Sequence, residues 1–192
     1  MEVLKVYNNN VVLASDDGRE VVLTGRGLGY QAKRGDRVDE DRVAQRFTPD
    51  AEHDVQQLTA FLTEIPPEHL ALAAEILQRA QAGLETTFTQ GMVIPLADHI
   101  SFAIKRVRQH IAVEYPLRSE VAHLYPKELR VARDAVALVS ARTGVQLPAD
   151  EAVPIALHFV NALFATEDLS RTFRMTELFR QVFAILDSAY DR

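Results

Sequence analysis

Two histidines, His99 and His158, have the surroundings in this sequence that best suit nucleophilic chemistry. Each borders the apolar stripe of a predicted helix, and Arg106 shares the helix face of His99 two turns further on. A neutral imidazole is a competent nucleophile near physiological pH. A histidine beside an apolar stripe is also commonly a packing residue, so position alone leaves both roles open. We expect both imidazoles to lie at a domain surface or interface rather than deep inside.

A second group of polar residues brackets one small predicted hairpin near the N-terminus. Asn8, Asn9 and Asn10 precede one β-prone run, and the sequence GRGLGYQ follows the next. Asparagine offers two donors and an acceptor, while glycine lets the backbone of a ligand come close. Alternatively, these glycines only form a bulge or a tight connection between strands.

The spacing of these glycines excludes a dinucleotide-binding loop. Gly25, Gly27 and Gly29 alternate, but Tyr30 stands at the position where the fingerprint requires its third glycine. We also expect a further strand, and not a helix, after the last glycine. No Gly-Lys-Ser/Thr sequence follows, so the P-loop of nucleoside triphosphatases is excluded as well.

Other common catalytic and metal chemistries lack the residues they need. The chain has no cysteine, which excludes disulfides, thiolate metal sites and thiol enzymes. No two histidines are four residues apart, so no metal site is predicted. The sequence contains no nucleophile–base–orienter pattern and no paired carboxylates with a plausible site. We therefore predict that the chain is not an enzyme and uses no cofactor.

Composition and charge divide the chain into two unequal parts. With 192 residues and 47% apolar content, the chain can bury one core or two smaller ones. It has no signal peptide and no apolar stretch approaching ~18 residues, which predicts a cytoplasmic protein without membrane insertion. Residues 1–47 carry eight Lys/Arg and eight Asp/Glu, whereas the rest carries thirteen and nineteen, a net charge of −6. Charge alone is a weak indication of nucleic-acid binding.

The pattern of hydrophobic residues predicts an α+β fold, with a small N-terminal antiparallel sheet followed by an all-α helical bundle. The expected strands cover residues 3–7, 11–14, 20–24 and 28–33. Asp17 and Gly18 form a hairpin turn signal. The expected helices cover residues 54–64, 67–84, 95–113, 126–142, 150–164 and 170–189. Three prolines stand at expected first helical positions, namely Pro67, Pro95 and Pro126. A sheet this small should dimerise or dock on another surface.

Six stretches of the sequence together resemble the BglG/SacY family of bacterial transcriptional antiterminators. They are KVYNNNVVL, TGRGLGYQ, KRGDRVDEDRV, LADHISFAIKR, YPKELRVARDAV and QLPADEAVPIALHFVNA. The resemblance implies a co-antiterminator RNA-binding domain over residues 1–54 and a phosphotransferase-system regulation domain over residues 55–168. Residues 169–192 would then be a linker or the first helix of a missing second regulation domain, making the chain a fragment or a naturally shortened form.

In that family the N-terminal domain dimerises and binds an RNA hairpin, stabilising it against an overlapping terminator. By resemblance, RNA contact is expected from Lys5, Asn8, Asn10, Gly25, Arg26, Gly27, Tyr30 and Gln31. Lys5 and Arg26 would meet phosphates or base edges, Asn10 would read an edge, and the Tyr30 ring would stack on an unpaired base. Alternatively, Tyr30 is a core residue of the sheet face, and Asn8 serves turn geometry.

The stretches DHISFAIKR and ALHFVNA match the family motifs whose histidines receive phosphoryl groups from the sugar phosphotransferase system. The resemblance therefore implies phosphorylation at His99 and His158. Added charge near a two-fold contact would weaken the RNA-binding dimer, or Arg106 would capture the phosphoryl group. The other four histidines match no family motif, namely His53, His69, His110 and His123.

The implied partners are an RNA antiterminator hairpin, a second copy of the chain as a homodimer, and the sugar permease and phosphocarrier proteins of the phosphotransferase system. No DNA partner is implied. A second hypothesis stays open, because the charge of the N-terminal segment is unremarkable: a dimerising protein-interaction module that is regulated by phosphorylation and binds no RNA.

Overall fold

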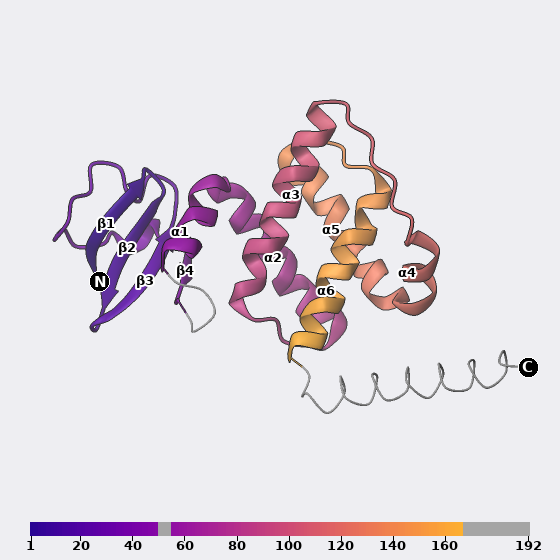
Figure 1. Cartoon of the computed structure of the whole chain (residues 1–192), viewed down its shortest axis with the longest axis horizontal. Helices are drawn as coiled ribbons and strands as arrows, with labels where there is room; N and C mark the ends of the chain where they lie inside the picture. Colours follow the sequence, from indigo (N-terminus) through magenta and orange to yellow (C-terminus); the bar gives the residue numbers. More distant parts are fainter. Residues whose placement is uncertain (50–54, 167–192) are drawn as a thin grey trace, which may run out of the picture.

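The computed structural model of the chain describes residues 1–49 and 55–166 (Figure 1). A four-stranded sheet lies at the N-terminal end, and a bundle of helices follows it. This architecture confirms the predicted α+β fold. The helix expected over residues 170–189 lies outside the described residues.

The sheet is antiparallel throughout, with the strand order β1-β2-β3-β4. Its strands are β1 (Glu2–Asn8), β2 (Val11–Asp16), β3 (Arg19–Thr24) and β4 (Gln45–Phe47). Asp17 and Gly18 connect β2 to β3 with φ angles of 49° and 83°. Positive φ at both positions suits the two-residue turn that the Asp-Gly signal predicts.

The strand expected over residues 28–33 is wrong, because this segment folds into consecutive turns and β4 completes the sheet instead. Gly27 and Gln31 have φ angles of 69° and 60°, which reverse the chain repeatedly. Backbone N–H groups therefore bond locally, from Leu28 to the Gly25 carbonyl and from Tyr30 to the Gly27 carbonyl, at 3.1 Å each. A connection including the short turn η1 (Glu40–Arg42) then leads to β4.

Both faces of the small sheet are covered within the chain. One face is formed largely by Val12, Ala14, Val21 and Leu23. These residues share a core cluster with Leu28 and Val38 of the β3–β4 connection. The opposite face is continuous with Leu58 and Leu62 of α1 (Val55–Glu64). The expected need of the sheet for a docking surface is thus met on this face by the chain's own helix.

Among residues 55–166, four longer helices pack around one core. Besides α1, the helices are α2 (Pro67–Leu84), α3 (Val93–Arg108), α4 (Arg118–Leu124), α5 (Pro126–Thr143) and α6 (Ala152–Thr166). α3 packs against α2 and α6, and α5 packs against α2 and α6. Buried Leu96, Ile100 and Phe159 lie in the shared core. In the described part of the chain, no helix is long and apolar enough to cross a bilayer.

The boundaries of α3 differ from the prediction at both ends. The helix begins at Val93, directly after the turn η2 (Gln90–Met92), so Pro95 is its third residue and not its first. Proline is tolerated there because the first backbone N–H groups of a helix have no intrahelical partner. The C-terminal end comes at Arg108, since His110 adopts a φ of 57° that a helix cannot continue. The short helix α4 was not predicted.

Candidate functional site

The structure brings His99 and His158 together, although they are far apart in the sequence. His99 lies on α3 and His158 on the neighbouring α6, with ring centroids 5.4 Å apart and planes inclined at 58°. The side chain of His99 is 15% exposed. Burial, together with the nearby His99, lowers the pKa of His158 to about 4, so its imidazole is neutral at physiological pH. Both rings are half-buried between α3 and α6, so neither lies deep inside the domain.

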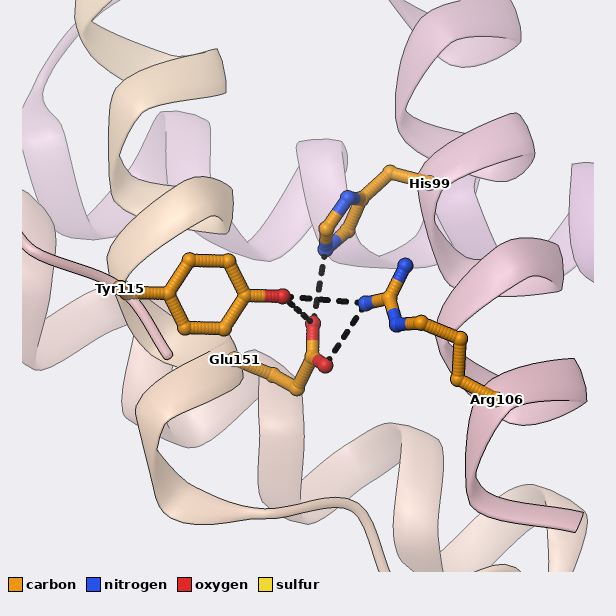
Figure 2. Close-up of polar contacts among 4 residues, drawn as sticks. All are labelled: His99, Arg106, Tyr115 and Glu151. Atoms are coloured by element: carbon orange, nitrogen blue, oxygen red, sulfur yellow. Dashed lines mark hydrogen bonds and ion pairs between the residues drawn. The ribbon is translucent and has the colours of Figure 1, made fainter. Parts of the chain in front are cut away.

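A buried carboxylate, Glu151, holds one nitrogen of His99 (Figure 2). Glu151 ends the turn η3 (Ala149–Glu151) just before α6, and its side chain is only 4% exposed. Its Oε2 accepts hydrogen bonds from His99 Nε2 at 3.1 Å and from the Tyr115 hydroxyl at 3.0 Å. Its Oε1 accepts from Arg106 Nη2 at 2.8 Å. The buried charge is thereby both paired and hydrogen-bonded, as buried carboxylates require.

The hydrogen bonds keep Glu151 ionised. Burial alone would raise the pKa of Glu151, but the bonds from His99, Arg106 and Tyr115 outweigh burial and hold this pKa below its usual value. The pKa of Tyr115 shifts upward instead, because burial and the adjacent carboxylate raise it to about 12. The phenol therefore stays protonated and donates to the carboxylate. Arg106 Nη2 also donates to the Tyr115 hydroxyl at 3.0 Å, which closes the network.

Sequence reasoning missed Glu151 and Tyr115. Glu151 precedes a helix, where an acidic residue is usual for helix-dipole reasons alone, so nothing in its local sequence indicated a histidine partner. His99 and Glu151 are 52 positions apart in the sequence, and the packing of α3 against α6 brings them together. Arg106 had been expected as a partner for an added phosphoryl group. In the structure it is instead bound to Glu151.

At the N-terminal candidate site, the asparagine turn and the glycine loop are bound to each other. Asn10 Oδ1 accepts a hydrogen bond from the backbone N–H of Gly27 at 2.9 Å. The backbone of Gly25 donates to the Asn10 carbonyl, also at 2.9 Å, and Gly29 donates to Asn9 at the same distance. The turn between β1 and β2 and the loop after β3 therefore form one connected unit.

Asn8 and the glycines have roles inside this unit. Asn8 Oδ1 accepts from the backbone N–H groups of Asn10 at 2.7 Å and Val11 at 2.9 Å, which supports the turn interpretation of Asn8. A Cβ at Gly25 would lie 1.8 Å from the Arg42 carbonyl oxygen, and one at Gly29 would lie 2.2 Å from that of Asn8. The tight-connection interpretation therefore accounts for both glycines, so their contact with RNA stays a prediction.

Four of the predicted RNA-contact residues are exposed, namely Lys5, Arg26, Tyr30 and Gln31, whereas Gly27 is half-buried. Arg26, Tyr30 and Gln31 all lie on the loop after β3, and 60% of Tyr30 is exposed, which makes the alternative of a core residue wrong. Lys5 lies apart from this loop, on β1, with its Nζ 4.7 Å from the centroid of the Tyr7 ring. The structure thus collects a guanidinium, an aromatic ring and amide groups around one loop and turn.

Comparison with known proteins assigns both parts of the chain. The family model of the CAT RNA binding domain matches residues 1–56, and that of the PRD domain matches residues 74–162. The chain thus has the domain order of the CAT–PRD class, with a CAT RNA binding domain followed by a PRD domain. A crystal structure of GlcT CAT-PRDI is similar, with a TM-score of 0.67, 30% sequence identity, and coverage of 84% of this chain and 97% of that one.

Two curated relatives are each 35% identical over 187 residues, or 97% of this chain. They are the transcription antiterminator LicT of Bacillus subtilis and the beta-glucoside operon antiterminator of Dickeya chrysanthemi. The chain belongs to the BglG/SacY family of transcriptional antiterminators, as its motifs predicted. It spans 67% and 66% of the length of these two relatives.

Proposed function

We propose that this chain, as a homodimer, binds an antiterminator hairpin in nascent mRNA and prevents formation of an overlapping terminator in a sugar-utilisation operon. The observation that carries this proposal is the unit in which Asn10 is bonded to Gly27 while Arg26 and Tyr30 stand exposed on the same loop. Two relatives support the proposal, because one is a transcription antiterminator and the other is the antiterminator of a beta-glucoside operon.

The chemistry of the loop suits unpaired RNA. Single-stranded RNA loops are recognised by stacking on aromatic rings or guanidinium planes and by hydrogen bonds to base edges. Tyr30 supplies the ring, Arg26 the guanidinium, and Asn10 an amide beside them. Since the chain carries a net charge of −6, the attraction for RNA must come from local contacts and not from an overall basic surface.

The proposed control is phosphorylation of His99 and His158 by proteins of the sugar phosphotransferase system, the permease and the phosphocarrier. A phosphoryl group adds nearly two negative charges. At His99 this charge would arise next to the ionised Glu151 and its partner Arg106. The added charge would act on the packing of α3 against α6, and through it on the surfaces available for dimerisation. Phosphorylation of this domain should therefore weaken the dimer and its RNA binding.

Gel-shift titration of a candidate hairpin with two charge-matched variants tests RNA binding. Arg26→Ala removes an exposed guanidinium from the loop, whereas Arg19→Ala removes one from the exposed start of β3, near the β2–β3 turn. We expect Arg26→Ala to weaken binding at least about tenfold and Arg19→Ala to leave it nearly unchanged. Equal effects, or no shift with the unaltered protein, would favour the protein-interaction module instead.

A further inference from the structure

The two ring nitrogens of His99 have different surroundings. Nε2 lies 3.1 Å from Oε2 of Glu151 (Figure 2). Nδ1 makes no hydrogen bond in the described part of the chain. It is also not among the fully buried polar atoms that lack a partner there, of which Thr24 Oγ1 is the single case, so Nδ1 is not fully enclosed. One nitrogen is hydrogen-bonded to the protein, and the other has no hydrogen-bond partner among the described residues.

The carboxylate determines which nitrogen carries the proton in the neutral ring. An ionised carboxylate can only accept hydrogen bonds, so the contact requires that Nε2 carry the hydrogen and donate. In the neutral tautomer with hydrogen on Nε2, the lone pair of the ring lies on Nδ1. The same arrangement of carboxylate and imidazole fixes the tautomer of the histidine in serine hydrolases, where it also stabilises the imidazolium that forms.

Glu151 is itself fixed in position. Arg106 Nη2 holds its Oε1 at 2.8 Å, and the Tyr115 hydroxyl shares its Oε2 at 3.0 Å. Two donors, Arg106 on α3 and Tyr115 in the segment before α4, therefore prevent the carboxylate from rotating away from His99. His158, by contrast, meets the network through its ring contact with His99.

From this geometry we propose that Nδ1 of His99 is the atom that accepts the phosphoryl group, and that Glu151 is the positioning residue that sets this choice. The inference rests on the proposed phosphorylation of His99.

In the transfer step, the Nδ1 lone pair attacks the phosphorus of a phosphohistidine on the donor protein. The new N–P bond forms as the donor N–P bond breaks, and the electron pair of the broken bond stays on the donor ring. That ring, protonated on its other nitrogen, leaves as a neutral imidazole. The Nε2 proton remains on His99, whose ring becomes an imidazolium, and the positive charge faces the Glu151 carboxylate.

The first measurement needs no phosphorylation. Long-range ¹H–¹⁵N correlation spectra of the full chain with ¹⁵N-labelled histidine report the tautomer of His99. We expect hydrogen on Nε2. A spectrum with hydrogen on Nδ1 would overturn the proposal, whatever the chain does with a phosphoryl donor.

The second measurement identifies the phosphorylated nitrogen. The chain is phosphorylated with purified phosphotransferase-system carrier proteins, the site is mapped by mass spectrometry, and ³¹P–¹⁵N couplings assign the nitrogen. Phosphorus bonded to Nδ1 is expected. Phosphorus on Nε2 of His99 overturns the acceptor assignment alone, whereas absence of label from His99 overturns the proposed function and the assignment with it.

A matched pair of variants tests the role of Glu151. Glu151→Gln removes the charge that faces His99, and Asp150→Asn removes the charge of its neighbour, an exposed carboxylate that pairs with Arg118. We expect the rate of His99 labelling to fall about ten- to a hundredfold in Glu151→Gln, with a mixed His99 tautomer, and to change little in Asp150→Asn. An unchanged tautomer in a folded Glu151→Gln protein contradicts the positioning role. If this variant does not fold, the measurements on the unaltered chain still decide which nitrogen reacts.

Discussion

The side-chain carbonyl of Asn10 accepts a hydrogen bond from the backbone N–H of Gly27, at 2.9 Å and across 17 residues of sequence. This bond fixes the loop that presents Arg26 and Tyr30 relative to the turn before β2. Because Oδ1 is used internally, the amide group of Asn10 can contribute its NH₂ donors to RNA while its oxygen maintains the loop. The side chain of Asn10 can therefore hold the loop while serving its proposed role in RNA recognition.

Substitutions at Asn10 separate these two roles. Asn10→Asp keeps an acceptor for Gly27 but replaces the NH₂ donors with a carboxylate, so we expect a stable fold and at least about tenfold weaker RNA binding. Asn10→Ala leaves the Gly27 N–H without its partner and should also lower the free energy of unfolding by about 1 kcal/mol. Thermal unfolding and gel-shift titration measure the two effects. Tight RNA binding by Asn10→Asp would show that the donors are not used.

Gly25 and Gly29 should be intolerant of any side chain for reasons of folding. A Cβ at either position would lie 1.8 Å or 2.2 Å from a backbone oxygen. We expect Gly25→Ala and Gly29→Ala to destabilise the N-terminal domain by about 3 kcal/mol or more, since backbone atoms must move. Gly91→Ala is the control, because its Cβ would meet only the Thr89 Oγ1 at 3.9 Å. Equal denaturant midpoints for all three variants would contradict the close approach.

Tyr30 should affect RNA affinity without affecting stability. Its ring is 60% exposed, so Tyr30→Ala removes little packing. Loss of base stacking is expected to cost about 1–3 kcal/mol of binding free energy, roughly a five- to hundredfold weaker complex. Tyr30→Phe keeps the ring and should bind nearly as tightly as the unaltered chain. If Tyr30→Ala binds RNA normally, the ring does not stack on a base.

Elements set by local interactions could be predicted from the sequence, whereas contacts that depend on tertiary packing could not. Residues 67–84 were predicted correctly because Pro67 suits the first position of a helix and opens α2. The segment 28–33 was misjudged because its β-prone side chains gave no sign of the positive φ at Gln31. Glu151 could not be assigned to His99, since only the packing of α3 against α6 brings them together.

The stability of the chain should depend on pH through His158. Burial and the neighbouring His99 lower its folded-state pKa to about 4, from an ordinary value of 6.5. Protonation therefore favours the unfolded chain, and the stabilisation is complete above the unfolded pKa and is lost as pH falls toward the folded one. Within this window the free energy of unfolding should fall by up to about 1.4 kcal/mol per pH unit.

Urea unfolding at a series of pH values measures this slope, and two variants assign it. His158→Leu should flatten the pH dependence between the unfolded and the folded pKa of His158. His123→Gln, at an exposed position on α4, should retain it. Below this window, protonation of Glu151 should dominate the pH dependence of stability, because the pKa of Glu151 is also held down. Its protonation breaks the contacts with His99 and Arg106. A slope that survives in His158→Leu would place the titrating group elsewhere.

Substitutions that keep the hydrogen bonds to Glu151 test the phosphorylation sites themselves. His99→Ala would leave Glu151 without one of its three donors, so this variant is expected to lose stability as well as a reactive ring. His99→Gln is the better test, since its amide can still donate to Glu151 but cannot accept a phosphoryl group. Combined with His158→Gln, it should abolish transfer from the phosphocarrier while leaving the unfolding midpoint nearly unchanged.

His123→Gln should be labelled like the unaltered chain, and RNA binding by the double variant should no longer respond to the phosphoryl donor. Intact-mass measurement followed by site mapping decides the matter, because label on another histidine in the double variant would assign the acceptor to that residue, namely His53, His69, His110 or His123.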